Sequence, residues 1–300
     1  MKKPGSPLCR AVTVLIFAGL IPTLLRAQSP PTWGFVENNG TKIFYEVAGS
    51  GTPVVLIHGG WLNSEQWDEQ FPRLSEGHRV VRYDFRGAGR SSLGDSSYSH
   101  TEDLAALLAH LNIQRADFVG LSQGSQIAID FVLAHPDAVR SMMIGGSPLS
   151  GFDMGPEFVQ GMRGVFTAGA ADDPQLTYDR IWAFAPFRVA SGMPAVRKRL
   201  DDLIVHENTW AANRAGAPRT KPVPAPPATR LGEIDRPVLV VVGEGDMPAF
   251  IREAEFVAGH VRGAELKRVK GAGHFVNLEQ PKSYDEILFT WLQHVDSLGR

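Results

Sequence analysis

Short, nearly continuous apolar runs alternate along this chain with longer amphipathic stretches. Six apolar runs have the length and character of strands buried on both faces of a sheet. They span residues 53–57, 78–83, 116–120, 139–145, 237–243 and 265–269. Four intervening stretches carry the helical period, at residues 101–111, 123–135, 249–259 and 283–295. This alternation predicts an α/β fold, with a doubly wound and mostly parallel sheet.

Two features of the pattern depart from that alternation. Near the start, residues 34–36 and 42–47 are strand-like and are separated by Asn38, Asn39 and Gly40, which predicts a hairpin. Residues 151–234 contain no clear strand. They carry three helical patterns, at 157–166, 176–187 and 196–212, and a return segment with four prolines among residues 221–227. The pattern predicts a helical cap at 151–234 inserted into a core of residues 28–150 and 235–300.

The first 27 residues have the pattern of a targeting segment. Lys2, Lys3 and Arg10 precede an apolar run at residues 11–25, which is shorter than the roughly 20 residues of a membrane span. Such a run is typical of a signal peptide, with cleavage expected after Ala27. The sequence therefore predicts an exported protein with no stable membrane span after processing. The alternative is an uncleaved amino-terminal membrane anchor.

Composition excludes several classes of protein. Thirty basic and 32 acidic residues give a net charge of −2, which argues against nucleic acid as a partner. The 16 phenylalanines and long aliphatic runs argue against disorder. Cys9 is the only cysteine, so an internal disulfide and a cysteine-rich zinc site are excluded. We expect neither a metal nor a cofactor. The composition carries no information on oligomeric state.

The clearest chemical motif is the pentapeptide centred on Ser122. Residues 120–124 read Gly-Leu-Ser-Gln-Gly, directly after a predicted strand and at the start of a predicted helix. That context is the one a nucleophile elbow requires, because a sharp turn with small flanking residues exposes the serine above the strand end. Ser125, one helical turn further on, should face the packing. Ser122 is therefore the candidate nucleophile.

A serine hydroxyl needs a base, and that base needs an acid. His274 follows the last strand in the glycine-rich sequence of residues 271–275, which favours it over the other eight histidines. Asp246 follows the strand at 237–243 and precedes His274, so the chain order is Ser, Asp, His. Glu244 is the rival acid. His58 is expected to hold backbone rather than to act in catalysis.

The negative charge that develops in acyl transfer needs hydrogen-bond donors already in place. The backbone N–H of Gln123, next to the nucleophile, is one candidate. The loop after the strand at 53–57 reads His-Gly-Gly-Trp and supplies the other. We expect Gly60 to donate, with Trp61 as the second choice, while Gly59 lets the loop pass close to the elbow.

Together these motifs resemble the α/β-hydrolase family, in the branch of bacterial esterases, enol-lactonases and C–C bond hydrolases. The matching motifs are the His-Gly-Gly turn at 58–60, residues 84–91, the elbow at Ser122, residues 243–246, and Gly273-His274 followed by residues 277–281. The resemblance extends over residues 34–298. It implies a mainly structural role for Asp84 and Arg86. Gln123, Gly124 and Ser125 stand where many relatives carry Met-Gly-Gly.

The resemblance implies a serine hydrolase that cleaves carboxylic esters of small to medium acyl groups through an acyl-enzyme. A lactonase or a C–C bond hydrolase with the same triad is the alternative. A ligand-binding homologue that keeps the triad only as a pocket is a third possibility. Epoxide hydrolases and dehalogenases are excluded, because they place aspartate where this chain has Ser122. The expected partner is a small-molecule ester or lactone.

Overall fold

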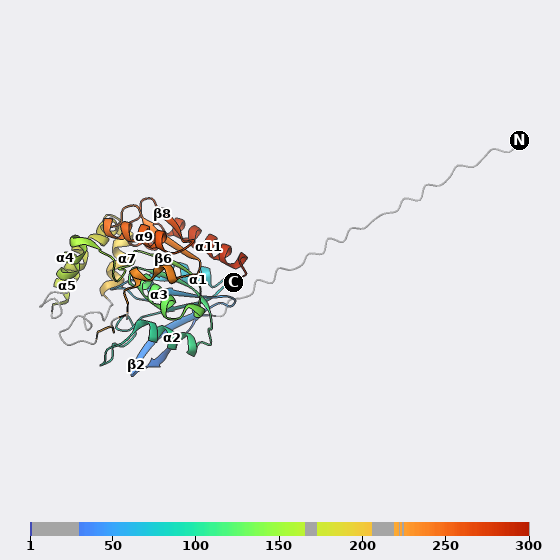
Figure 1. Cartoon of the computed structure of the whole chain (residues 1–300), viewed down its shortest axis with the longest axis horizontal. Helices are drawn as coiled ribbons and strands as arrows, with labels where there is room; N and C mark the ends of the chain where they lie inside the picture. Colours follow the sequence, from blue (N-terminus) through green and yellow to red (C-terminus); the bar gives the residue numbers. More distant parts are fainter. Residues whose placement is uncertain (2–29, 166–172, 206–218, 222, 224, 300) are drawn as a thin grey trace.

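A computed structural model describes residues 1, 30–165, 173–205, 219–221, 223 and 225–299. The predicted signal peptide at residues 1–27 thus lies almost entirely outside the described residues. Eight strands form one sheet, in the order β1-β2-β4-β3-β5-β6-β7-β8 (Figure 1). Their bounds are β1 Thr32–Asn38, β2 Thr41–Ala48, β3 Pro53–Ile57, β4 Arg79–Tyr83, β5 Ala116–Leu121, β6 Val139–Gly145, β7 Val238–Gly243 and β8 Glu265–Val269.

The sheet is mostly parallel, as the sequence predicts. Only the pairs β1–β2 and β2–β4 run antiparallel. The first of these is the predicted hairpin, and both residues of its turn, Asn39 and Gly40, have positive φ angles of 49° and 72°. Such a turn matches the twist of the two strands that it connects. The predicted doubly wound α/β fold is confirmed.

Helices cover both faces of the sheet because its strands are apolar on both sides. In β3, Val55 and Ile57 join the core under α2 (His100–His110), α3 (Gln123–Ala134) and α9 (Pro248–His260). Val54 and Leu56 point the other way, into the core under α1 (Gln70–Leu74) and α11 (Pro281–Ser297). Both clusters are almost fully buried, which accounts for the continuous apolar runs in the sequence.

Between β6 and β7 the chain leaves the sheet and forms α4 (Gly155–Val165), α5 (Pro174–Ala183), α6 (Arg188–Ser191) and α7 (Pro194–Val205). Figure 1 shows α4 and α5 beside one end of the core. One prediction here is wrong, because residues 176–187 are not a single helix. Helix α5 ends at Ala183 and a short 3-10 turn, η3 (Ala185–Phe187), follows. Pro186 has no N–H to continue a helix.

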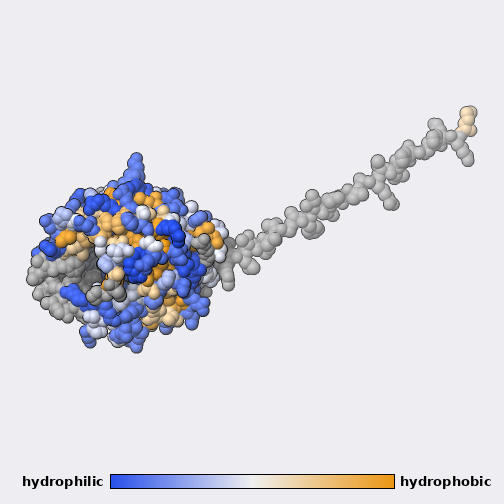
Figure 2. Space-filling view, viewed as in Figure 1, coloured by the Kyte–Doolittle hydropathy of each residue, from blue (hydrophilic) through white to orange (hydrophobic). Residues whose placement is uncertain are grey.

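Other short elements carry no clear signal in the sequence. These are the 3-10 helix η1 (Ser64–Trp67), helix α1 and helix α10 (Val276–Glu279). The predicted helix at 196–212 is described only as far as α7 extends, and the rest lies outside the described residues. No described helix combines the length and the apolar character that crossing a membrane demands. On the face seen in Figure 2, hydrophilic and apolar residues are interspersed.

Candidate active site

Ser122 stands at the tight turn that joins β5 to α3. Its backbone has φ 55° and ψ −121°, which are rare for a residue with a side chain. The Ser122 N–H donates to Gly145 O at 2.7 Å, so the neighbouring strand β6 holds the turn. Strain of this kind persists only where the surroundings enforce it, and it is concentrated at functional sites.

Residues 120 and 124 must both be glycine, because the turn leaves no room for a side chain at either position. A Cβ on Gly124 would lie 2.1 Å from Ile57 O, and one on Gly120 would lie 2.6 Å from Gly124 O. Neither contact is sterically possible, so any side chain there would push α3 away from β3 and β5. Ser125 is fully buried, and its hydroxyl donates to Gly120 O at 2.8 Å. It packs beneath the turn, as expected from its place in the helix.

His274 and Asp246 come together from two different loops at the ends of the last two strands. His274 Nδ1 lies 3.0 Å from Asp246 Oδ2 and 3.2 Å from Oδ1, and both side chains are buried. Asp246 Oδ1 also accepts from the Met247 N–H at 2.7 Å. This arrangement fixes Nδ1 as the protonated nitrogen and directs Nε2 away from the acid. Glu244, the rival acid, is exposed.

Two further buried carboxyl groups lie close to this pair, and neither was singled out from the sequence. Burial raises the pKa of Glu253 well above its ordinary value, and the nearby charge of Asp246 raises it further. Burial also raises the pKa of Glu279 to about 7, although its carboxylate accepts from the Gly273 N–H. Both glutamates therefore favour their neutral forms more strongly than an exposed glutamate would.

The loop after β3 passes directly over the elbow. A Cβ on Gly60 would stand 2.9 Å from the side-chain oxygen of Gln123, so the two residues are in contact. At Gly59 an added Cβ would lie 3.5 Å from Ser122 Cβ, which is ordinary contact, so the steric need for glycine is weaker there. Trp61 follows with a positive φ of 60°. The expected role of the Gly60, Trp61 and Gln123 N–H groups as donors to the developing oxyanion remains a prediction.

His58 holds this loop, as the sequence suggests. Its Nδ1–H donates to Gly59 O at 2.8 Å, and its Nε2 accepts from the Phe85 N–H at 3.3 Å. Burial lowers the pKa of His58 to about 4 despite the charge of Asp84, so the ring is neutral at pH 7. A neutral ring can accept at Nε2, whereas a protonated one could not. His58 therefore acts as a structural clamp.

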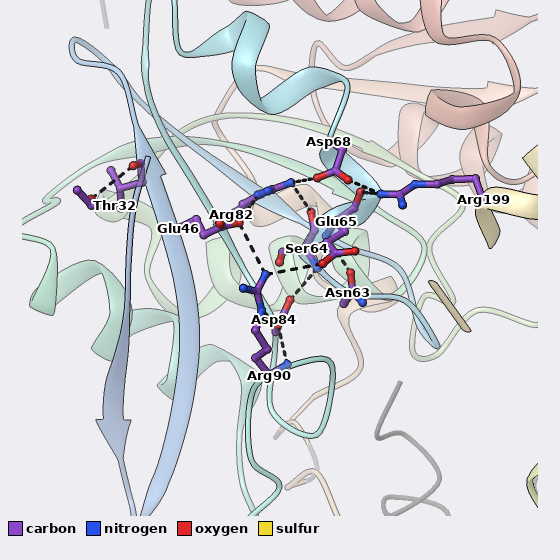
Figure 3. Close-up of polar contacts among 11 residues, drawn as sticks. Thr32, Glu46, Asn63, Ser64, Glu65, Asp68, Arg82, Asp84, Arg90 and Arg199 are labelled. Carbon is purple, nitrogen blue, oxygen red and sulfur yellow. Dashed lines mark hydrogen bonds and ion pairs between the residues drawn. The ribbon is translucent and has the colours of Figure 1, made fainter. Parts of the chain in front are cut away.

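A network of charged side chains secures the next turn of the loop (Figure 3). Asp84 accepts from the Ser64 N–H at 2.7 Å and from the Arg90 N–H at 2.8 Å. Asp68 pairs with Arg82 on β4 and with Arg199 on α7, so it connects the core to the inserted helices. The carboxylate of Asp84 is thus occupied in holding backbone, which agrees with the structural role expected for it.

A second set of contacts joins this loop to the loop of His274. The Gly59 N–H donates to the side-chain oxygen of Gln66 at 2.8 Å. The Asn277 side-chain amide in turn donates to Gln66 O at 3.1 Å.

The loop after β6 also contacts His274. Gly146 packs so closely on His274 that an added Cβ would lie 2.7 Å from the ring. Gln66 and Gly146 were missed from the sequence, because nothing local marks contacts between distant segments.

One cavity of about 310 Å³ brings the candidate residues together. Ser122, His274, Gly60, Trp61 and Gln123 all line it, and Asp246 lies behind His274. Half of the remaining residues that line the cavity are aromatic, and some of these come from the inserted segment between β6 and β7. Among the described residues, no three His, Cys, Asp or Glu side chains converge as metal ligands would.

A serine in the tight turn after a parallel strand, with an aspartate and a histidine in the loops after two later strands of the same sheet, is typical of α/β hydrolases. Residues 54–286 match the alpha/beta hydrolase family, so the chain belongs to that family. This confirms the resemblance inferred from the motifs, and it supports hydrolase activity.

Three similar proteins illustrate the range of chemistry in this family. The non-heme haloperoxidase of Rhodococcus erythropolis is 29% identical over 264 residues, covering 79% of this chain and 90% of that protein. The 2-hydroxy-6-oxononadienedioate/2-hydroxy-6-oxononatrienedioate hydrolase of Paraburkholderia xenovorans strain LB400 is 26% identical, covering 86% and 93%. The solved structure of Est816, an N-acyl homoserine lactone degrading enzyme, superposes with a TM-score of 0.69 at 28% identity, covering 86% and 99%.

Proposed function

We propose that this protein is a serine hydrolase that cleaves carboxylic esters of small to medium acyl groups. The observation that carries the proposal is that Ser122, His274, Gly60 and Gln123 all line the same cavity, with Asp246 bonded to His274. These residues supply a nucleophile, a base, two backbone donors and an orienting acid. Residues 151–234, whose described helices contribute part of the cavity wall, form the cap domain in this proposal.

The reaction proceeds through an acyl-enzyme. Ser122 Oγ attacks the ester carbonyl while His274 Nε2 takes its proton, and Asp246 stabilises the resulting imidazolium. The Gly60 and Gln123 N–H groups donate to the oxygen that becomes negative. His274 then gives its proton to the departing alcohol, and a water molecule repeats the sequence to release the acid. No step requires a metal or a cofactor.

Hydrolysis of a lactone or of a C–C bond is the second candidate. Two similar proteins support it: Est816, which degrades N-acyl homoserine lactones, and the Paraburkholderia xenovorans hydrolase named above. Either reaction would use the same residues of this chain as ester hydrolysis. A lactone is a cyclic ester, so its opening needs a cavity of different shape but the same chemistry. A ligand-binding homologue would retain the cavity without turnover.

Turnover of a substrate panel tests these candidates. We expect the purified chain to hydrolyse p-nitrophenyl esters of short and medium chain length, at a rate that EDTA leaves unchanged. Preference for homoserine lactones over all acyclic esters would favour the lactonase. No turnover of any ester, lactone or C–C substrate, together with no reaction with a fluorophosphonate probe, would favour the binding protein.

We further propose that the protein is exported after removal of residues 1–27. The support is the basic start and short apolar run of the amino terminus. Mass spectrometry of protein recovered from the exported fraction should show a chain that starts at Gln28, within about three residues of that position. Recovery of the intact amino terminus in the membrane fraction would indicate an anchor instead.

A further inference from the structure

A buried carboxyl group is bonded to the loop that carries His274. Glu279 is the last residue of α10, the short helix that follows this loop, and only 3% of it is exposed. Its Oε2 accepts from the N–H of Gly273, the residue directly before His274. Glu279 is not among the described residues that line the cavity, so any effect that it has on the reaction must pass through this loop.

The inserted helix α6 meets the loop at the same point. A Cβ added to Gly273 would lie 2.7 Å from Val189 Cβ, on α6, and 3.3 Å from Glu279 Oε1. This Oε1 makes no regular hydrogen bond to a described residue, but the Ala190 N–H of α6 lies close enough to favour the charged form of the carboxyl. Glu279 is therefore enclosed between the loop of His274 and the inserted segment.

The charge of Glu279 changes near neutral pH. Burial raises its pKa to about 7, whereas the Gly273 N–H and the neighbouring His274 lower it and Asp246 raises it further. No other residue of α10 is charged, and Arg188, the charged residue of α6, is exposed. His274 and Asp246 are thus the charged groups that act on this carboxyl.

The two protonation states of Glu279 differ in how firmly they hold the loop. The ionised carboxylate accepts from the Gly273 N–H in a charge-assisted hydrogen bond, which is roughly twice as strong as a neutral one. The protonated carboxyl loses that advantage. It also carries no negative charge that could favour the imidazolium formed on His274 during the reaction.

We propose that Glu279 is a positioning residue for His274, whose ionised carboxylate fixes the loop of the base against α6. This inference rests on the proposed function, in which His274 is the base. It implies that ionisation of Glu279 raises activity. Ionisation also lowers stability, because the unfolded chain releases this proton near the ordinary pKa of 4.5 and the native protein only near 7.

Glu279→Gln tests the proposal, because glutamine keeps the shape of the side chain and an oxygen that can accept from the Gly273 N–H, but carries no charge. The measurement is kcat/KM for p-nitrophenyl butyrate as a function of pH. We expect the ratio of wild type to variant to rise from about one at about pH 5 to about five at about pH 8.5. Protonation of His274 is common to both proteins, and a merely structural hydrogen bond would give a ratio that does not change with pH.

Thermal unfolding of the same two proteins gives a readout that is independent of activity. The wild type should lose stability relative to Glu279→Gln as the pH rises from about 5 to about 8, because the native protein holds the Glu279 proton to higher pH than the unfolded chain does. Relative to the variant, the wild type thus gains activity and loses stability over the same range of pH. A stability difference that is independent of pH would show that Glu279 does not titrate in this range, and would overturn the inference.

Gln280→Ala is the matched control. The Gln280 side-chain amide donates to Gly271 O at 3.2 Å, so it holds the same loop without a group that ionises. Any loss of kcat/KM in this variant should be the same at every pH. A ratio of wild type to Glu279→Gln that is constant with pH, or the same pH dependence in Gln280→Ala, would overturn this inference and leave the proposed function intact. Failure of the wild type to hydrolyse any ester would overturn the proposed function itself.

Discussion

Ser122→Ala is expected to abolish ester hydrolysis, with kcat reduced by a factor on the order of 10⁵ to 10⁶, as is found when the nucleophile of a serine hydrolase triad is removed. The elbow exposes this hydroxyl in the cavity that His274 also lines. Without it, no acyl-enzyme can form, and the remaining groups can only polarise a bound ester. A fluorophosphonate probe should label the native protein on Ser122 and should leave the variant unlabelled.

Ser125→Ala is the matched control for that variant. Ser125 is a buried serine three residues further on, and its hydroxyl bonds to Gly120 O beneath the elbow. The hydroxyl also accepts from the buried Gly145 N–H at 2.8 Å, so its loss should lower the free energy of unfolding by about 1–3 kcal/mol, with labelling retained. Full labelling of Ser122→Ala would show that the reactive serine lies elsewhere.

Asp246→Asn is expected to lower kcat by a factor of about 10⁴, the loss found for the same change in a serine protease triad. Asn can still accept from the Met247 N–H, so the loop geometry is preserved. Its amide, however, cannot stabilise a protonated His274, and an NH₂ group turned toward Nδ1 would favour the wrong tautomer. Steady-state kinetics on the best ester of the panel, with circular dichroism to verify folding, measures this effect.

Glu244→Gln is the control, since Glu244 is exposed and lies two residues from Asp246. It should change kcat by less than about twofold, because an exposed charge is screened by solvent. If Glu244→Gln proved the more damaging of the two, the acid would have to be reassigned. Equal and small effects from both would mean that His274 is oriented by another group.

Local signals in the sequence account for the framework of the fold. Strands of a parallel sheet are buried on both faces. For this reason β3, β5, β6 and β7 appear in the sequence as nearly continuous apolar runs. The elbow is also local, because Gly120, Ser122 and Gly124 are needed by a single turn. Periodicity alone is less reliable near a proline. The helical period in the sequence continues past Pro186, whereas helix α5 ends at Ala183.

The remaining contacts of the candidate site depend on tertiary structure. The contact of Gln66 with Asn277 joins residues more than two hundred positions apart, and no periodicity encodes such a pairing. Glu253 and Glu279 have the sequence context of ordinary glutamates, and their pKa values are raised first by burial in the folded protein. Arg219 lies in a segment without a recognisable motif, and its alignment with Tyr98 brings it to the cavity.

The sequence by itself therefore determined the class of fold, the family and the order of the candidate catalytic residues. Each of these depends on periodicity and on steric demands within a few neighbouring residues. Tertiary structure decided which side chains share the cavity and which carboxyl groups are shielded from water. Those properties arise from the packing of segments distant in the chain, whose relative placement depends on the whole fold.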